Sequence, residues 1–169
     1  MGMSKLKLMK GYTWGEALQP TSKFPNGRVQ YPCLIEPKVD EIRLPVLVQD
    51  DGVQYLSYAG KALHNIPAQW DDEFSNLADW FGIREFDCGI LVNNNFNDSY
   101  RLVRSSKGLP DDLIGAEVVL HLYDLPTLDL PYADRRDMVA EIVEFPQPNI
   151  PFRQLDAYVC DRPEDVAAW

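Results

Sequence analysis

The residue of this sequence best suited to covalent chemistry is a lysine flanked by carboxylates. It is Lys38, in the segment Glu36-Pro37-Lys38-Val39-Asp40-Glu41-Ile42-Arg43, with apolar residues on both sides (33–35 and 44–48). A lysine amine attacks an electrophile only when it is neutral, and burial or nearby cations favour that form. Neighbouring carboxylates favour the charged form, unless a substrate or a metal ion offsets them. The segment therefore predicts either a nucleophilic lysine or a surface ion pair at a strand end.

Further along the chain, three segments carry polar and aromatic residues within or beside β-prone runs. They are Leu56-Ser57-Tyr58-Ala59-Gly60-Lys61 with Asn65-Ile66-Pro67, Phe86-Asp87-Cys88-Gly89-Ile90-Leu91-Val92, and Leu120-His121-Leu122-Tyr123-Asp124-Leu125-Pro126 continuing to Leu130-Pro131-Tyr132-Ala133-Asp134-Arg135-Arg136. In this order, and together with the lysine segment, they resemble the motifs of the covalent nucleotidyltransferases. The family comprises ATP-dependent DNA ligases, RNA ligases and capping enzymes. The similarity extends over about residues 33–145 and is greatest to the adenylation domain of phage-type ATP-dependent DNA ligases.

The resemblance implies a role for each matching residue. Lys38 matches the nucleophile that attacks the α-phosphate of ATP, with Mg²⁺ offsetting the phosphate charge. The AMP would then pass to a 5′-phosphate at a nick in duplex DNA, in DNA replication or repair. Glu36 matches the residue that contacts the adenine amino group, Tyr123 the ring that stacks on adenine, and Arg43 the arginine near the ribose or phosphate. Asp40 and Asp87 match supporting carboxylates, and no residue is assigned to a protein-bound metal.

Three positions depart from the family pattern. Glu41 stands where the family has glycine, and it adds bulk and negative charge beside a triphosphate. Tyr58 stands where the family has arginine. Gly89 stands where the family has glutamate, which removes a ribose or metal contact. We expect these changes to weaken ATP binding.

The family's last two lysine-containing motifs and its oligonucleotide-binding barrel have no counterpart in the sequence. After Lys61 the only lysine is Lys107. We therefore expect residues 1–31 to form an irregular segment with a short helix and 32–169 to form a partial adenylation domain, truncated before the last two motifs. A second chain could complete it. We expect the 169 residues alone not to seal nicks, so enzymatic activity of this chain is an open question.

The charge of the chain favours a second interpretation. The net charge is −10. Residues 1–64 carry eight Lys/Arg and six Asp/Glu, and 65–169 carry eight and twenty, which gives +2 and −12. A protein that holds duplex DNA needs a positive face. The alternative is a non-catalytic acidic protein on a degenerate ligase scaffold, such as a phage effector, inhibitor or DNA mimic that binds a host protein. The acidity is also explained by an ordinary solvated acidic surface. A third interpretation of the motifs is an RNA ligase or a capping enzyme.

Cysteine usage and hydropathy give expectations about the compartment. Three widely spaced cysteines form no zinc or disulfide pattern, which favours reduced thiols in the cytoplasm, of an infected host if the gene belongs to a bacteriophage. No apolar stretch is long enough for a signal peptide or a membrane span, so no membrane partner is expected. The two isolated histidines, His64 and His121, suggest no metal site.

The pattern of apolar residues predicts an α+β fold with antiparallel sheets flanked by helices, in agreement with an incomplete ligase-type nucleotidyltransferase domain. The Asp50-Asp51-Gly52 turn predicts a hairpin. Strands are expected at 32–36, 42–49, 53–58, 85–92, 96–104, 117–124 and 155–160, and helices at 13–18, 67–81 and 134–143. Trp70, Phe74, Leu77 and Phe81 should face the core from the second helix.

Overall fold

The computed structural model describes residues 14–168, which form two compact units. The larger unit contains residues 39–154, and the smaller unit contains 14–38 and 155–168. None of the described helices is both long and apolar enough to cross a membrane.

A five-stranded sheet forms the centre of the larger unit. Its order is β3-β2-β4-β5-β6, with antiparallel neighbours except for the parallel pair β5–β6. The predicted turn at 50–52 is confirmed. It connects the two strands of the first hairpin, in which Gly52 lies opposite Gln49. The strands are β2 (Ile42–Gln49), β3 (Gly52–Tyr55), β4 (Glu85–Val92), β5 (Val118–Asp124) and β6 (Phe152–Arg153). The short β6 was not predicted from the sequence.

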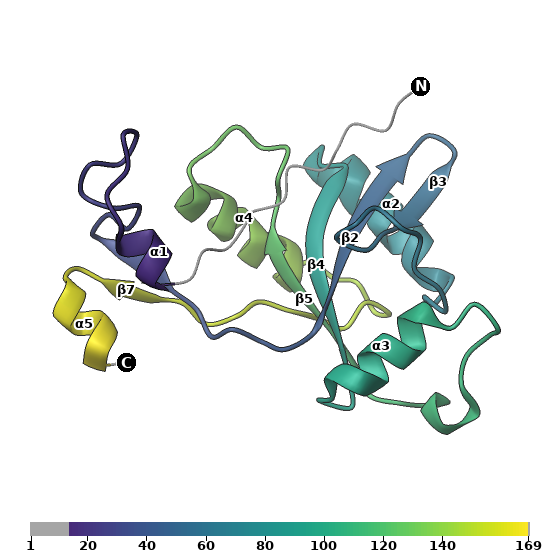
Figure 1. Ribbon diagram of the computed structural model, residues 1–169. Helices are drawn as coiled ribbons and strands as arrows, with labels where there is room; N and C mark the ends of the chain where they lie inside the picture. Colours follow the sequence, from purple (N-terminus) through teal and green to yellow (C-terminus); the bar gives the residue numbers. More distant parts are fainter. Residues whose placement is uncertain (1–13, 169) are drawn as a thin grey trace. The chain divides into compact units, whose positions relative to one another are not determined.

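The helices α2 (Gln69–Phe81) and α4 (Tyr132–Glu144) cover one side of this sheet (Figure 1). The predicted apolar face of α2 is confirmed, because Trp70, Phe74 and Leu77 are almost fully buried and Phe81 packs against the core at its edge. In the sheet, the core-facing residues alternate along the strands: Leu44, Val46 and Val48 in β2, Phe86, Cys88 and Ile90 in β4, and Leu120 and Leu122 in β5. A fold of strands and helices around one core was expected and is confirmed.

One predicted strand is wrong: residues 96–104 form the helix α3 (Phe96–Arg104). The preceding asparagines explain the difference. Asn93 and Asn94 adopt positive φ angles of 52° and 51°, and the side chain of Asn95 accepts hydrogen bonds from the backbone N–H groups of Asn97 and Asp98. That arrangement is a helix N-cap. The turn was predicted, but its role as a helix start was not.

The smaller unit contains two short strands and two short helices. The strands β1 (Cys33–Ile35) and β7 (Tyr158–Cys160) pair antiparallel. The predicted strand at 155–160 is therefore shorter than expected, whereas the predicted helix at 13–18 is confirmed as α1 (Trp14–Leu18). The last helix is α5 (Pro163–Ala168).

Candidate nucleotide-binding face

The face of the sheet opposite the core carries the polar residues of the predicted motifs. Side chains alternate between the two faces along a strand. Since the residues listed above from β2, β4 and β5 point into the core, their neighbours point to the other side. This polar face, as we call it below, includes Arg43 of β2, Asp87 and Gly89 of β4, His121 and Tyr123 of β5, and Arg153 of β6.

Arg43 and Asp87, two of the predicted site residues, form an ion pair on the polar face. Nε of Arg43 donates to Oδ1 of Asp87 at 2.8 Å, and Nη2 donates to Oδ2. The Asp87 side chain is fully buried, whereas 27% of the Arg43 side chain is exposed. Burial raises the pKa of Asp87, and the guanidinium of Arg43 opposes that shift. The hydrogen bond to Asp87 in turn raises the pKa of Arg43. Arg43 is therefore a permanently charged group held in a fixed orientation.

A second buried ion pair, which the sequence interpretation did not assign, lies beside the first. Asp124 is the register partner of Asp87 on β5, and it is 2% exposed. It accepts hydrogen bonds from Nε and Nη2 of Arg135, at 2.6 and 3.0 Å. The signal for this pair was present, because both residues lie in the last motif segment. Only the fold shows that the start of α4 returns to the end of β5.

Tyr58, which stands in place of an arginine, lies next to Arg43. The guanidinium carbon of Arg43 is 5.8 Å from the centre of the Tyr58 ring. The Tyr58 side chain itself is largely exposed, at 60%. The ring therefore covers part of the Arg43 guanidinium, in a geometry typical of cation–π contacts.

Glu41 lies over Gly89, so the other two departures from the family pattern are in direct contact. A methyl group at residue 89 would overlap the Glu41 carboxylate and would lie 2.8 Å from Cε2 of Tyr123. Gly89 does not have a positive φ angle, so the need for glycine here is one of space. Oε2 of Glu41 lies 2.8 Å from Nδ1 of His121. The two side chains therefore share a hydrogen bond between these atoms.

His121 and Tyr123 stand side by side on β5. Their ring centres are 6.3 Å apart with an angle of 24° between the planes. His121 also lines a pocket of about 360 Å³, together with Leu91, Val119 and Arg153. Sequence reasoning assigned Tyr123 but gave His121 no function, although its place in a strand was predicted and is confirmed.

The remaining predicted residues lie on the segment that links the two units. Glu36 and Lys38 belong to the smaller unit, directly after β1, and Asp40 lies at the start of the larger unit. Lys38 and Asp40 are exposed, and Glu36 is partly buried. The polar face described above thus brings together Arg43, Asp87 and Tyr123.

The described residues contain no group of three or more His, Cys, Asp or Glu side chains placed to hold a metal ion. The acidic residues of the polar face are instead engaged in ion pairs with arginine or in the contact with His121.

Comparison with known proteins gives no match to a family model or to a curated protein sequence, but it finds similar solved structures. One is a protein described as Pmar-Lig_Pre, with a TM-score of 0.63, 21% identity and coverage of 80% of this chain and 33% of that chain. The Chlorella virus DNA ligase-adenylate matches at a TM-score of 0.54 and 21% identity, covering 83% and 48%. The ATP-dependent DNA ligase of bacteriophage T7 in complex with ATP matches at 0.57 and 14% identity, covering 80% and 51%.

This chain therefore spans about a third to a half of the length of the structures that it matches. The ligase-type nucleotidyltransferase fold predicted from the motifs is confirmed.

Proposed function

We propose that this chain, which has the fold of the adenylation domain of ATP-dependent DNA ligases, is a ligase-like nucleotidyltransferase that binds ATP on its polar face. One observation carries the proposal. Residues from three motif segments far apart in the sequence, Arg43, Asp87 and Tyr123, converge on the one face of the sheet that α2 and α4 leave uncovered. The likeness to viral and phage ligases supports the same conclusion.

In the proposed reaction, Lys38 is the nucleophile. The neutral amine attacks the α-phosphorus of ATP, the bond from that phosphorus to the oxygen bridging to the β-phosphate breaks, and pyrophosphate leaves. The nitrogen loses a proton to solvent, and a lysyl-AMP remains. A divalent cation would bind through the phosphates of the nucleotide and would neutralise part of their charge. The AMP would then be transferred to the 5′-phosphate at a DNA nick.

The other residues of the proposed site bind and orient the nucleotide. Tyr123 offers a ring for stacking on adenine, and Glu36 offers a carboxylate to its amino group. Arg43 supplies a positive charge to the ribose or phosphate, and Asp87 fixes its direction through two hydrogen bonds. In this proposal residues 32–169 form the adenylation domain in part, and a second chain or further sequence supplies the lysines that the later motifs contain in the family.

Calorimetric titration with ATP tests the nucleotide site through Tyr123. Replacing Tyr123 by Leu keeps an apolar side chain but removes the ring, so affinity should fall by about tenfold, the lower range for loss of one base-stacking contact. Tyr100→Leu is the matched control, because Tyr100 is exposed on α3. Equal affinities of the wild type and Tyr123→Leu would contradict this site, and so would a folded protein that binds no ATP.

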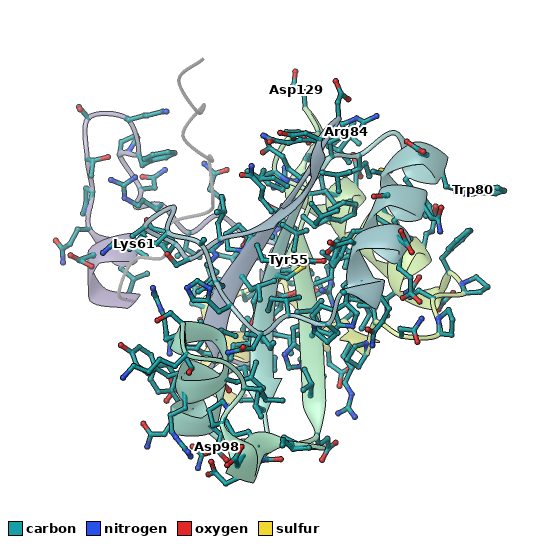
Figure 2. The ribbon with its side chains drawn as sticks, turned by 90° about the vertical axis from the view of Figure 1, so that its right-hand side faces the viewer. Tyr55, Lys61, Trp80, Arg84, Asp98 and Asp129 are labelled. Atoms are coloured by element: carbon teal, nitrogen blue, oxygen red, sulfur yellow. The ribbon has the colours of Figure 1, made fainter. Side chains whose placement is uncertain are left out.

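A second candidate function, an acidic protein-binding module on the same scaffold, is favoured by a separate surface. Trp80 extends outward from α2 (Figure 2), and 73% of it is exposed. Its ring packs against Phe145 with ring centres 5.3 Å apart, beside a hollow that Pro146, Pro148 and Asp79 also line. An exposed tryptophan at the edge of an apolar hollow is typical of protein-binding surfaces. Replacing Trp80 by Ser should abolish capture of a basic host protein while leaving ATP binding intact.

A further inference from the structure

The carboxylate of Glu41 is buried with only one of its oxygens satisfied. Only 3% of the side chain is exposed. Oε2 is bonded to His121, whereas Oε1 is buried and receives no hydrogen bond from any residue that the structure describes. A buried acceptor without a donor destabilises the folded state, because it has lost its hydrogen bonds to water without replacement. Such groups are rare in folded proteins, and each needs an explanation such as strain, a catalytic role or a bound partner.

The surroundings of this oxygen indicate what kind of partner it would accept. Oε1 lies over the backbone of Gly89, and Tyr123 closes the same space from the side. The ring of Tyr123 is the surface proposed above for stacking on the base. A nucleoside stacked on that ring carries hydroxyl and amino groups that can donate a hydrogen bond to such an oxygen.

The sequence pattern at residues 41 and 89 is a second reason to assign this carboxylate to the nucleotide site. Glu41 stands where glycine is expected, and Gly89 stands where glutamate is expected. In the structure the carboxylate of residue 41 fills the space that a side chain on residue 89 would need. The two departures therefore compensate each other: the space above residue 89 still holds a carboxylate, which reaches it from the segment before β2 rather than from β4.

We propose that Glu41 is a nucleotide-binding residue of this chain, whose Oε1 accepts a hydrogen bond from a hydroxyl or amino group of the nucleoside. His121 is its positioning residue, because the bond from Nδ1 to Oε2 fixes the direction in which Oε1 points. Gly89 is required because only glycine leaves room for this carboxylate. The proposal rests on the nucleotide site proposed above, and it reverses the expectation that Glu41 opposes ATP binding.

The test combines a change in the protein with a change in the ligand. Affinities for ATP, 2′-deoxy-ATP, 3′-deoxy-ATP and inosine triphosphate are measured for the wild type and for Glu41→Gln. 2′-Deoxy-ATP and 3′-deoxy-ATP each lack one hydroxyl donor, and inosine triphosphate has a carbonyl and an N1–H in place of the amino group and the bare N1 of adenine. The analogue that lacks the partner of Glu41 should bind the wild type about tenfold more weakly than ATP does, as expected for the loss of one strong hydrogen bond. For Glu41→Gln that same analogue and ATP should differ by less than about threefold. Glu144→Gln, at an exposed position of α4, is the matched control.

Two further variants test the geometry without depending on the analogue. Gly89→Ala should displace the Glu41 carboxylate and weaken ATP binding by about tenfold. Glu41→Gly combined with Gly89→Glu returns one carboxylate to the same space, and it should recover most of the affinity that Glu41→Gly alone loses. Thermal unfolding of each variant separates loss of binding from loss of folding.

The outcomes separate this proposal from the one on which it rests. A wild type that binds ATP but shows the same analogue ratios as Glu41→Gln would overturn the role of Glu41 and leave the nucleotide site standing. A folded wild type that binds none of the four nucleotides would overturn both. An exchange variant that binds no better than Glu41→Gly would contradict the compensation between residues 41 and 89.

Discussion

At the scale of single residues, the ion pair between Arg43 and Asp87 shows how the polar face holds a cation in place. The Asp87 carboxylate has no contact with solvent, so its charge depends on Arg43. Asp87→Asn would remove that charge, and Arg43→Met would leave it buried without a partner. Arg43→Met should lower stability more than removal of both charges does, because an uncompensated buried charge is more destabilising than the loss of the whole ion pair.

We predict that Arg43→Met lowers the free energy of unfolding by about 3 kcal/mol, the usual cost of leaving one partner of a buried pair alone. The double variant Arg43→Met with Asp87→Asn should recover most of that loss. Urea unfolding at pH 7 measures both. Arg101→Met is the matched control. Arg101 pairs with Asp112 at the surface, so its replacement should leave stability nearly unchanged. A double variant as unstable as Arg43→Met would contradict the prediction.

The sequence was informative about some of these residues and not about others. The motif order placed Arg43, Asp87 and Tyr123 among the predicted site residues, and the structure places all three on the polar face. The contact between Glu41 and Gly89 could not be predicted, because it joins residues 48 positions apart and depends on the register of β2 with β4. Taken one at a time, the two looked like losses to the site, and only the fold shows that they occupy one space.

At the scale of elements, Tyr55 connects β3 to α2. Its hydroxyl donates to Oδ1 of Asp71 at 2.8 Å, and the residue lies between the sheet and the helix (Figure 2). Burial, and then the hydrogen bond to Asp71, raise the pKa of Tyr55 well above the value of 10.0 for a free phenol. The unfolded chain therefore loses this proton near pH 10, whereas the native protein keeps it.

The consequence is a loss of stability in alkaline solution. Above pH 10 the unfolded state binds one proton fewer than the native state, so the free energy of unfolding falls as the pH rises. We predict that the wild type loses about 1.4 kcal/mol per pH unit more than Tyr55→Phe does in this range. Urea unfolding between pH 9 and 11 measures the two slopes, with Tyr100→Phe as an exposed control. Parallel curves for the wild type and Tyr55→Phe would show that Tyr55 ionises equally in both states.

Long periodic elements were the easiest to predict. Strands β2 and β4 and helix α2 lie close to their predicted positions, because eight or more residues of regular apolar pattern define each of them. Helix α3 was missed since its nine residues are short and its cap was interpreted only as a turn. The antiparallel pairing of β1 with β7, in which Cys33 lies opposite Cys160, was not expected, because 127 positions separate these two residues. Both are free cysteines.

At the scale of the whole molecule, the negative net charge opposes the binding of DNA. The net charge of −10 opposes contact with phosphates, and residues 65–169 alone carry −12. Proteins that hold duplex DNA gain much of their affinity from lysine and arginine contacts to the backbone. In our proposal the chain therefore carries the nucleotide chemistry, while DNA binding needs additional positive surface.

We predict that the chain of 169 residues neither binds nicked duplex DNA at 150 mM salt nor seals it. Fluorescence anisotropy with a labelled nicked duplex measures binding, and gel electrophoresis of the nicked strand under denaturing conditions measures sealing. A complete ATP-dependent DNA ligase is the positive control in both assays. Closure of nicks in a single turnover by the purified chain would contradict the prediction.

The most direct measurement is the transfer of label from ATP to the protein. The purified chain is incubated with Mg²⁺ and ATP carrying radioactive phosphorus at either the α or the γ position, and the denatured protein is counted. Our account predicts that label from the α position stays on the wild type, that label from the γ position does not, and that Lys38→Arg retains neither. Lys107→Arg is the matched control and should behave as the wild type. A folded wild type without α label, or α label that persists in Lys38→Arg, would contradict the account.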